Sequence, residues 1–311
     1  MAAVPPDRIV GIGTRAKRAT IRFLNRQRAG WKAMLSGTSE SSESSLLSGL
    51  QSAHPRQRWE SAAEMGRDSH LNEEAVAALV SLLADPEEFV AWQAASALGQ
   101  QDSGRVFGAL AAALSDRDPR CRAGAARALG FLGGEAAAGQ LAQRLGDPVS
   151  SVRVATAEAL GRTGDPGCAE SLVLLLSDES TDVRRAAAQA LGKLGSPQTA
   201  PPLAQALQTP SQPLLVRRAL AAALAAIPHP DARPVLMDAL SDADPQVRAY
   251  AAQALGHVGD ESAYAALLPL LADRSRLLQG TVSSEAEKAR SMLERRGRRG
   301  LIAGLQRETR R

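Results

Sequence analysis

The most regular stretch of the sequence is residues 147–192, which read DPVSSVRVATAEALGRTGDPGCAESLVLLLSDESTDVRRAAAQALG. The Val-Arg and Ala-Leu-Gly elements within it recur after 31 residues. Ahead of each Val-Arg pair, at Asp147 and Asp182, stands an aspartate of the kind that starts a helix. The stretch therefore contains one complete repeating unit and the start of the next.

Each unit is expected to fold into two helices. In the first, Val152, Ala155 and Leu160 recur at helical spacing, so this helix has one apolar face. Gly161 and Gly164 are predicted to end it, because glycine readily takes the left-handed conformation found at helix C-termini. A second, leucine-rich helix is predicted to follow an Asp-Pro start at residues 165–166.

The same residue types recur at corresponding positions far on both sides of this stretch, and we call each set of corresponding positions a column. Residues of the glycine column follow one another at spacings of 33, 31, 31, 31, 33 and 31: Gly66, Gly99, Gly130, Gly161, Gly192, Ala225 and Gly256. Eight residues before each column member lies an arginine, except that Ala91 takes this place in the second unit. Neither helix of a unit can bury its apolar face alone, so the units must stack. The predicted fold is all-α, an α-solenoid that forms a right-handed superhelix of about seven two-helix repeats.

Aspartates beside the arginine column predict a ladder of ion pairs that fixes the register between units. The residues assigned to this ladder are Asp118, Arg122, Asp147, Arg153, Asp182, Arg184, Arg217, Asp244 and Arg248. The alternative is that the arginines bind phosphate, but aspartates repeated at the same period would already occupy them.

These columns resemble the HEAT repeat, specifically its short, phycobilisome-lyase-like subtype. Val152-Arg153 with Ala159-Leu160-Gly161, and Val183-Arg184 with Ala190-Leu191-Gly192, show the resemblance best. In that family the second helices line the concave side of the solenoid, which implies a partner-binding surface that is mostly small and uncharged. Its candidate residues are Gly139, Gln140, Gln143, Glu170, Ser171, Leu174, Pro201, Pro202, Gln205, Val235, Ala265, Ala266 and Pro269. Such a surface suits a helix or an extended peptide of another protein, and the alternative is a solvated face without function.

Four segments are expected along the chain. Residues 1–35 form a basic amphipathic helix, 36–53 a flexible Ser/Gly-rich linker, 54–273 the solenoid, and 274–311 a capping helix with a basic tail, in which Ser283 and Ser284 are expected to cap the helix. The two ends each have a net charge of +7, while residues 36–273 have −10. The first helix is a cap of the solenoid, a docking or membrane-surface helix, or a presequence. The basic tail is a solvated segment or a contact for nucleic acid or anionic membrane.

Nothing in the sequence indicates a catalytic, metal or cofactor site, so we expect none. None of the four histidines is followed by Glu, unlike the repeated His-Glu pairs of the HEAT-like deoxyhypusine hydroxylases. Dinucleotide, P-loop and nucleophile-elbow motifs are missing. Cys121 and Cys168 fall at packing positions and are expected to be small buried residues in a reducing compartment. We expect a cytoplasmic protein, with organellar import through residues 1–45 as the alternative.

Three functions compete. The first is a non-catalytic scaffold or adaptor that binds a protein partner. The second follows from the resemblance alone: a subunit of a bilin lyase or a phycobiliprotein chaperone, in which case the ligand is a tetrapyrrole. The third is association with nucleic acid or an anionic membrane through the basic ends.

Overall fold

The computed structural model describes residues 43–68, 71–101 and 104–308, with the backbone alone for residues 298–308. The chain divides into two units, Met1–Leu46 and Leu47–Arg311, and the helix pairs lie in the second. The first helices of the seven described pairs are α3 (Pro55–Met65), α5 (Glu88–Gly99), α7 (Pro119–Leu132), α9 (Ser150–Thr163), α11 (Thr181–Leu194), α13 (Leu214–Ala226) and α15 (Pro245–Val258). The second helices are α4 (Glu73–Ser81), α6 (Gly104–Ala113), α8 (Gly134–Ala142), α10 (Ala169–Leu174), α12 (Ala200–Gln208), α14 (Arg233–Ala239) and α16 (Glu261–Leu267). The last helix is α17 (Val282–Glu308).

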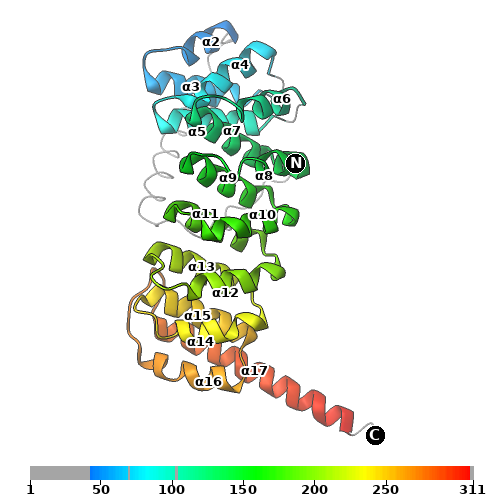
Figure 1. The fold of residues 1–311 in the computed structure, drawn as a ribbon, viewed down its shortest axis with the longest axis vertical. Helices are drawn as coiled ribbons and strands as arrows, with labels where there is room; N and C mark the ends of the chain where they lie inside the picture. Colours follow the sequence, from blue (N-terminus) through cyan, green and yellow to red (C-terminus); the bar gives the residue numbers. More distant parts are fainter. Residues whose placement is uncertain (1–42, 69–70, 102–103, 309–311) are drawn as a thin grey trace, which may run out of the picture. The chain divides into compact units, whose positions relative to one another are not determined.

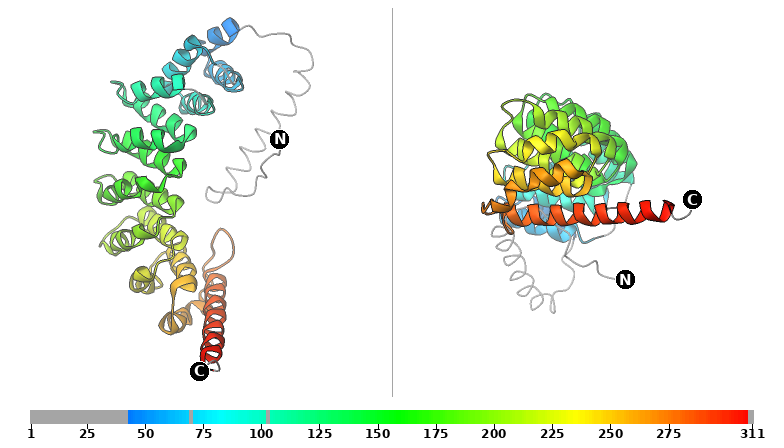
Figure 2. Two further views of the ribbon diagram at one scale, coloured as in Figure 1. Left: turned by 90° about the vertical axis from the view of Figure 1, so that its right-hand side faces the viewer. Right: turned by 90° about the horizontal axis from the view of Figure 1, so that it is seen from below.

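The first helices form one continuous row (Figure 1). Each packs directly on the next, from α3 on α5 through to α15 on α17. Each second helix packs mainly against the first helix of the following pair, so it links two successive units. Figure 2 shows the stack of helix pairs from two further sides. The predicted all-α solenoid of two-helix repeats is confirmed.

The glycine column has a packing role that the sequence analysis did not assign to it. A Cβ atom on Gly130 would lie 2.7 Å from the Cα of Ala159, and one on Gly161 would lie 2.8 Å from the Cα of Ala190. The prediction that Gly161 ends its helix is therefore wrong: Gly161 is buried inside α9, where it lets the backbones of α9 and α11 approach closely. Gly164 does end α9, with a left-handed φ of 72°.

The leucine before each of the last six column positions lies in the centre of the core. Leu98, Leu129, Leu160, Leu191, Leu224 and Leu255 are all 0% exposed. Burial of a leucine side chain stabilises a fold by about 1.5–3 kcal/mol. A row of six therefore contributes substantially to the stacking of the first helices.

Polar residues begin several helices as the sequence predicted. Asp118 accepts a hydrogen bond from the backbone N–H of Arg120 at the start of α7, and Asp244 accepts from those of Gln246 and Val247 at the start of α15. Asp165 accepts from the N–H of Gly167 and starts the short 3₁₀ turn that leads into α10. These bonds satisfy amide groups that the helices themselves leave unpaired.

The expected linker over 36–53 does not hold for residues 43–50, which form α2 (Glu43–Leu50). Leu46, Leu47 and Leu50 fall on one side of a helical turn, and Leu50 is buried. The expected amphipathic helix over 1–35 and the first part of the linker lie outside the described residues.

The capping helix at the other end is present but differs in two ways from the prediction. Thr281, rather than Ser283 or Ser284, begins it: the Thr281 hydroxyl accepts from the N–H of Ser284 at 3.3 Å, and the Ser284 hydroxyl accepts from the N–H of Thr281 at 3.2 Å. The helix also continues to Glu308. The basic run 295–299 is therefore helical and not an irregular tail.

Candidate functional site

A ladder of partly buried ion pairs runs along the starts of the first helices. In five pairs the arginine guanidinium bonds an aspartate carboxylate that lies where the next unit begins. The pairs, with the Nε–Oδ2 distance, are Arg58–Asp85 at 2.6 Å, Arg122–Asp147 at 2.7 Å, Arg153–Asp178 at 2.8 Å, Arg217–Asp242 at 2.9 Å and Arg248–Asp273 at 2.8 Å. A ladder between successive units was predicted, and the structure identifies the carboxylates.

Each ladder arginine also bonds to the loop before its own helix. Arg153 Nη1 donates to the carbonyl oxygens of Asp147 and Pro148, at 2.9 and 3.3 Å. The carboxylate that pairs with Arg153 is fixed as well, because Asp178 Oδ1 accepts a hydrogen bond from the N–H of Ser180 at 2.8 Å. One arginine thus holds two successive inter-repeat loops, which explains its place in the repeat.

Three aspartates assigned to the ladder do not belong to it. Asp118 pairs with Arg120, Asp182 pairs with Arg185, and Asp244 pairs with Arg218. These aspartates lie at the first turn of a helix, whereas the ladder carboxylates lie two or more residues earlier, in the loop. Spacing alone could not distinguish the two, because both sets recur at the same period.

The ladder has two interruptions. Ala91 replaces the arginine in the second pair, so Asp116 has no ladder arginine. Arg184 keeps its bonds to the carbonyl oxygens of Asp178 and Glu179. The position that corresponds to a ladder carboxylate, six residues before Arg217, is Ser211, and Arg184 Nε is buried without a hydrogen-bond partner within the described ranges. The other five arginines are occupied by carboxylates, which leaves no room at them for the phosphate alternative.

The ladder changes the acidity of its aspartates. Burial is the largest influence on the Asp178 carboxyl and would raise its pKa. Hydrogen bonds from Arg153 and the N–H of Ser180, with the two neighbouring guanidinium charges, outweigh burial and lower that pKa below its ordinary value. The same balance lowers the pKa of Asp147 and Asp273. These carboxylates are therefore ionised in the folded protein at neutral pH.

The thirteen residues predicted to bind a partner lie on the second helices or directly beside them. We call them the second-helix surface. Twelve are at least partly exposed, and Leu174 is 78% exposed, although leucine is an apolar residue. Val235 is the exception: it is 7% exposed and belongs to the packing of α14, so its assignment to the surface is wrong. The helical turn places Val235 beside Leu236 on the side that faces the first helices.

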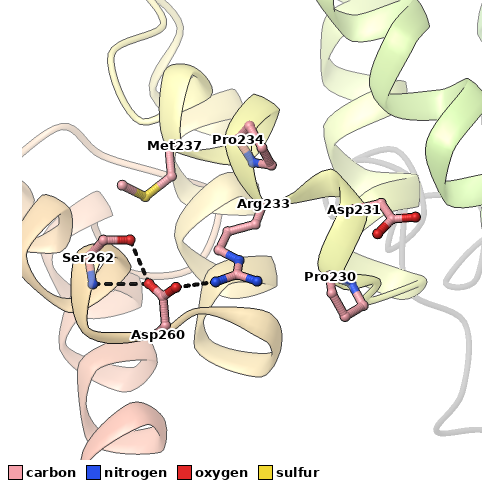
Figure 3. A pocket seen from close by; sticks show the side chains of 7 residues that line it. All are labelled: Pro230, Asp231, Arg233, Pro234, Met237, Asp260 and Ser262. Atoms are coloured by element: carbon pink, nitrogen blue, oxygen red, sulfur yellow. Dashed lines mark hydrogen bonds and ion pairs between the residues drawn. The ribbon is translucent and has the colours of Figure 1, made fainter.

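Two open pockets lie between successive second helices, and of the thirteen predicted residues only Val235 lines one of them. The first, of about 430 Å³, is lined by Pro230, Asp231, Arg233, Pro234, Met237, Asp260 and Ser262. Figure 3 shows its floor: Asp260 accepts from the hydroxyl and the N–H of Ser262 and forms an ion pair with Arg233. The second pocket, of about 470 Å³, is lined by residues of α12 and α14 and by Ser241 and Asp242.

The bonds around Asp260 keep it ionised. The Ser262 hydroxyl, the N–H of Ala263 and the charge of Arg233 lower the pKa of Asp260 to about 2. The pocket thus combines a fixed ion pair with the apolar side chains of Pro230, Pro234 and Met237. Such a combination can receive an apolar side chain and orient a neighbouring polar group.

A group of residues on the first helices was not predicted from the sequence. Trp92 of α5 and Phe131 of α7 pack edge to face with ring centroids 5.7 Å apart, and the Arg162 guanidinium of α9 lies 5.1 Å from the Phe131 centroid. Phe89 and Trp92 are 49% and 48% exposed. The available signal was the clustering of scarce aromatic residues in the first units, since five of the nine in the chain fall between residues 59 and 131.

The structure also locates the two cysteines that the sequence pointed to. Cys121 and Cys168 are free and buried, as expected, and burial raises the pKa of the Cys121 thiol to about 11. No cluster of His, Cys, Asp or Glu suited to a metal ion occurs among residues 43–68, 71–101 and 104–308. Within these residues, no helix has both the length and the apolarity to cross a membrane.

Comparison with known proteins gives matches to repeat proteins. The family model for HEAT repeats matches residues 90–153, 139–215 and 212–284. The E. coli protein YibA is similar in structure, with a TM-score of 0.58, 20% sequence identity, and coverage of 83% of this chain and 88% of YibA. Comparison with curated protein sequences gives no significant match.

Two further solved structures are more distant. An engineered protein has a TM-score of 0.47 and 23% identity over 80% of this chain and 77% of its own. The complex of CpcE and CpcF of phycocyanin lyase from Nostoc sp. PCC7120 has a TM-score of 0.40 and 20% identity over 83% of this chain and 96% of its own.

Proposed function

The chain belongs to the HEAT-repeat family, and we propose that it is a non-catalytic scaffold that binds another protein along its second-helix surface. The observation that supports this most directly is that accessible residues of this surface recur on or beside α8, α10, α12 and α16. They repeat along the stack, as a surface for an elongated ligand requires. A helix or an extended segment of a partner fits this arrangement, because its side chains recur at regular intervals.

The composition of the second-helix surface supports the same proposal. Pro201, Pro202, Ala265 and Pro269 are accessible, small and uncharged, so a partner backbone can approach them closely. Leu174 provides a large apolar contact. Burial of such residues in an interface removes apolar area from water, which favours binding by about 25 cal/mol per Å² before the costs of association.

The test is a pull-down of the tagged full chain from its native host with two variants. Gln205→Arg places a bulky charge on the exposed side of α12, and Gln253→Arg places the same charge on the exposed side of α15, in the row of first helices. We expect a stoichiometric, colourless protein partner that is lost with Gln205→Arg and retained with Gln253→Arg.

Two results would contradict the proposal. Equal recovery of the partner with both variants would remove the second-helix surface from the interface. A partner whose eluate absorbs visible light as a bilin does would favour the pigment-binding alternative over a simple scaffold.

A further inference from the structure

A second surface lies on the opposite row of helices and is distinct from the one in the proposed function. It consists of Phe89 and Trp92 on α5, Arg127 and Phe131 on α7, Arg162 on α9 and Lys193 on α11, and we call it the first-helix strip. Its members connect one helix to the next through the Trp92–Phe131 and Phe131–Arg162 contacts. The four helices stack in order, so the strip is continuous across four units.

Stacking of the repeats does not explain the aromatic end of the strip. Trp92 lies seven residues before the glycine column, where the first pair has Trp59. The other five pairs have small or basic residues at this position: Ala123, Val154, Arg185, Arg218 and Ala249. Those pairs stack without an aromatic side chain there. Two large aromatic side chains, each about half exposed, are therefore available for contact with another molecule.

The other end of the strip has positive charge that its neighbours do not fully balance. Glu158 lies 3.6 Å from Arg162, and the highly exposed Glu88 lies 3.8 Å from Arg127. Lys193 forms no ion pair within the described part of the chain, and burial together with the charge of Arg162 lowers its pKa. A carboxylate of a bound molecule at this end would be attracted by the positive charges of both Lys193 and Arg162.

Nucleic acid fits this surface less well than protein. Base stacking needs a free aromatic face, but Phe131 is engaged by the edge contact with Trp92 and by Arg162. A continuous phosphate backbone would also pass Glu88 and Glu158, which repel it. A peptide can instead place one carboxylate at the basic end and an apolar side chain at the aromatic end.

We propose that the first-helix strip binds an acidic segment of a protein partner. A large apolar side chain of that segment packs against Phe89 and Trp92, and a carboxylate next to it pairs with Arg162 and Lys193. Trp and Arg are among the residue types that most often dominate binding energy at protein interfaces.

The probe is a library of short random peptides displayed on phage and selected on the immobilised full chain. Enriched peptides are then measured in solution by fluorescence anisotropy against the wild type, Trp92→Ala and Lys193→Glu. We expect enriched peptides to contain a large apolar residue close to Asp or Glu. We expect Trp92→Ala to weaken their binding about 30-fold, as for a central interface tryptophan, and Lys193→Glu to weaken it about tenfold.

Leu174→Glu on α10 is the matched control, and it should leave this binding unchanged even if the second-helix surface proves to have no partner. Thermal unfolding of each variant should show that the fold is intact, because the side chains of Trp92, Leu174 and Lys193 are all exposed.

Three results would overturn the proposal. The first is selection of peptides without acidic residues. The second is binding that is insensitive to both Trp92→Ala and Lys193→Glu. The third is a different occupant of the strip. RNA would be indicated by binding of poly(U) that Lys193→Glu abolishes. A second copy of this chain would be indicated by a doubled mass in light scattering that Trp92→Ala returns to that of a monomer.

Discussion

Replacement of Gly161 by alanine tests the packing of the first-helix row directly. In most helices this change stabilises, because alanine has the higher helix propensity by about 1 kcal/mol. Here the added Cβ would lie 2.8 Å from the Cα and 2.9 Å from the Cβ of Ala190. Carbon atoms pack at about 3.5–4.0 Å, so α9 and α11 would have to separate by about 1 Å.

The cost of this separation decides the sign of the effect. Overpacking of a well-packed core costs about 1–3 kcal/mol. We expect the upper half of this range because Ala190 Cα and Cβ cannot move unless the backbone of α11 moves, and α11 is itself stacked on both sides. After subtraction of the gain in propensity, Gly161→Ala should destabilise the protein by about 1–2 kcal/mol.

Gly108→Ala provides the matched control. Gly108 lies inside the exposed part of α6, and a Cβ there meets no atom within 4 Å. This variant should gain about 0.4–1 kcal/mol. Urea unfolding followed by circular dichroism at 222 nm gives both free energies of unfolding, provided that the m-values stay equal. If both variants were stabilised to the same extent, the close approach of α9 and α11 would be refuted.

Further predictions follow from the ladder and the core. Arg153→Ala should lower the free energy of unfolding by about 3–5 kcal/mol, because it leaves the Asp178 carboxylate buried without its partner. Arg184→Ala removes no ion pair and should lower it clearly less in the same urea assay. Equal losses of stability in the two variants would show that the Asp178 carboxylate is unimportant. The pKa of Asp178 is lower in the folded than in the unfolded protein. Its contribution to stability is therefore complete above about pH 4 and is lost as the pH falls through the folded pKa. The urea midpoint should fall steeply in acid, and less steeply in the Asp178→Asn variant. Leu160→Ala should cost about 2–5 kcal/mol by leaving a cavity, and an unchanged thermal midpoint would contradict the assigned core.

The period of the sequence was sufficient to predict the fold. Columns at 31 to 33 residues place one apolar stripe on every helix, and such helices have no way to bury that stripe except by stacking. The helix pairs, the row of buried leucines such as Leu160 and the Asp-started helices could therefore be predicted residue by residue. The ladder arginines could be predicted too, since a guanidinium that recurs at the repeat period needs a recurring partner.

The identity of each partner was decided by the tertiary structure. Several aspartates recur at the same period as Arg122, and only the path of the loop brings Asp147, rather than Asp118, to its guanidinium. Gly161 is a further example: its sequence neighbours suggest a helix end, but its role is to admit the backbone of α11 from the next unit. The burial of Val235 and the contact of Trp92 with Phe131 likewise depend on the rotation of helices that are distant in sequence. A repeating pattern specifies which side of a helix is apolar because that depends on local spacing, whereas contacts between units depend on how closely and at what angle their helices pack.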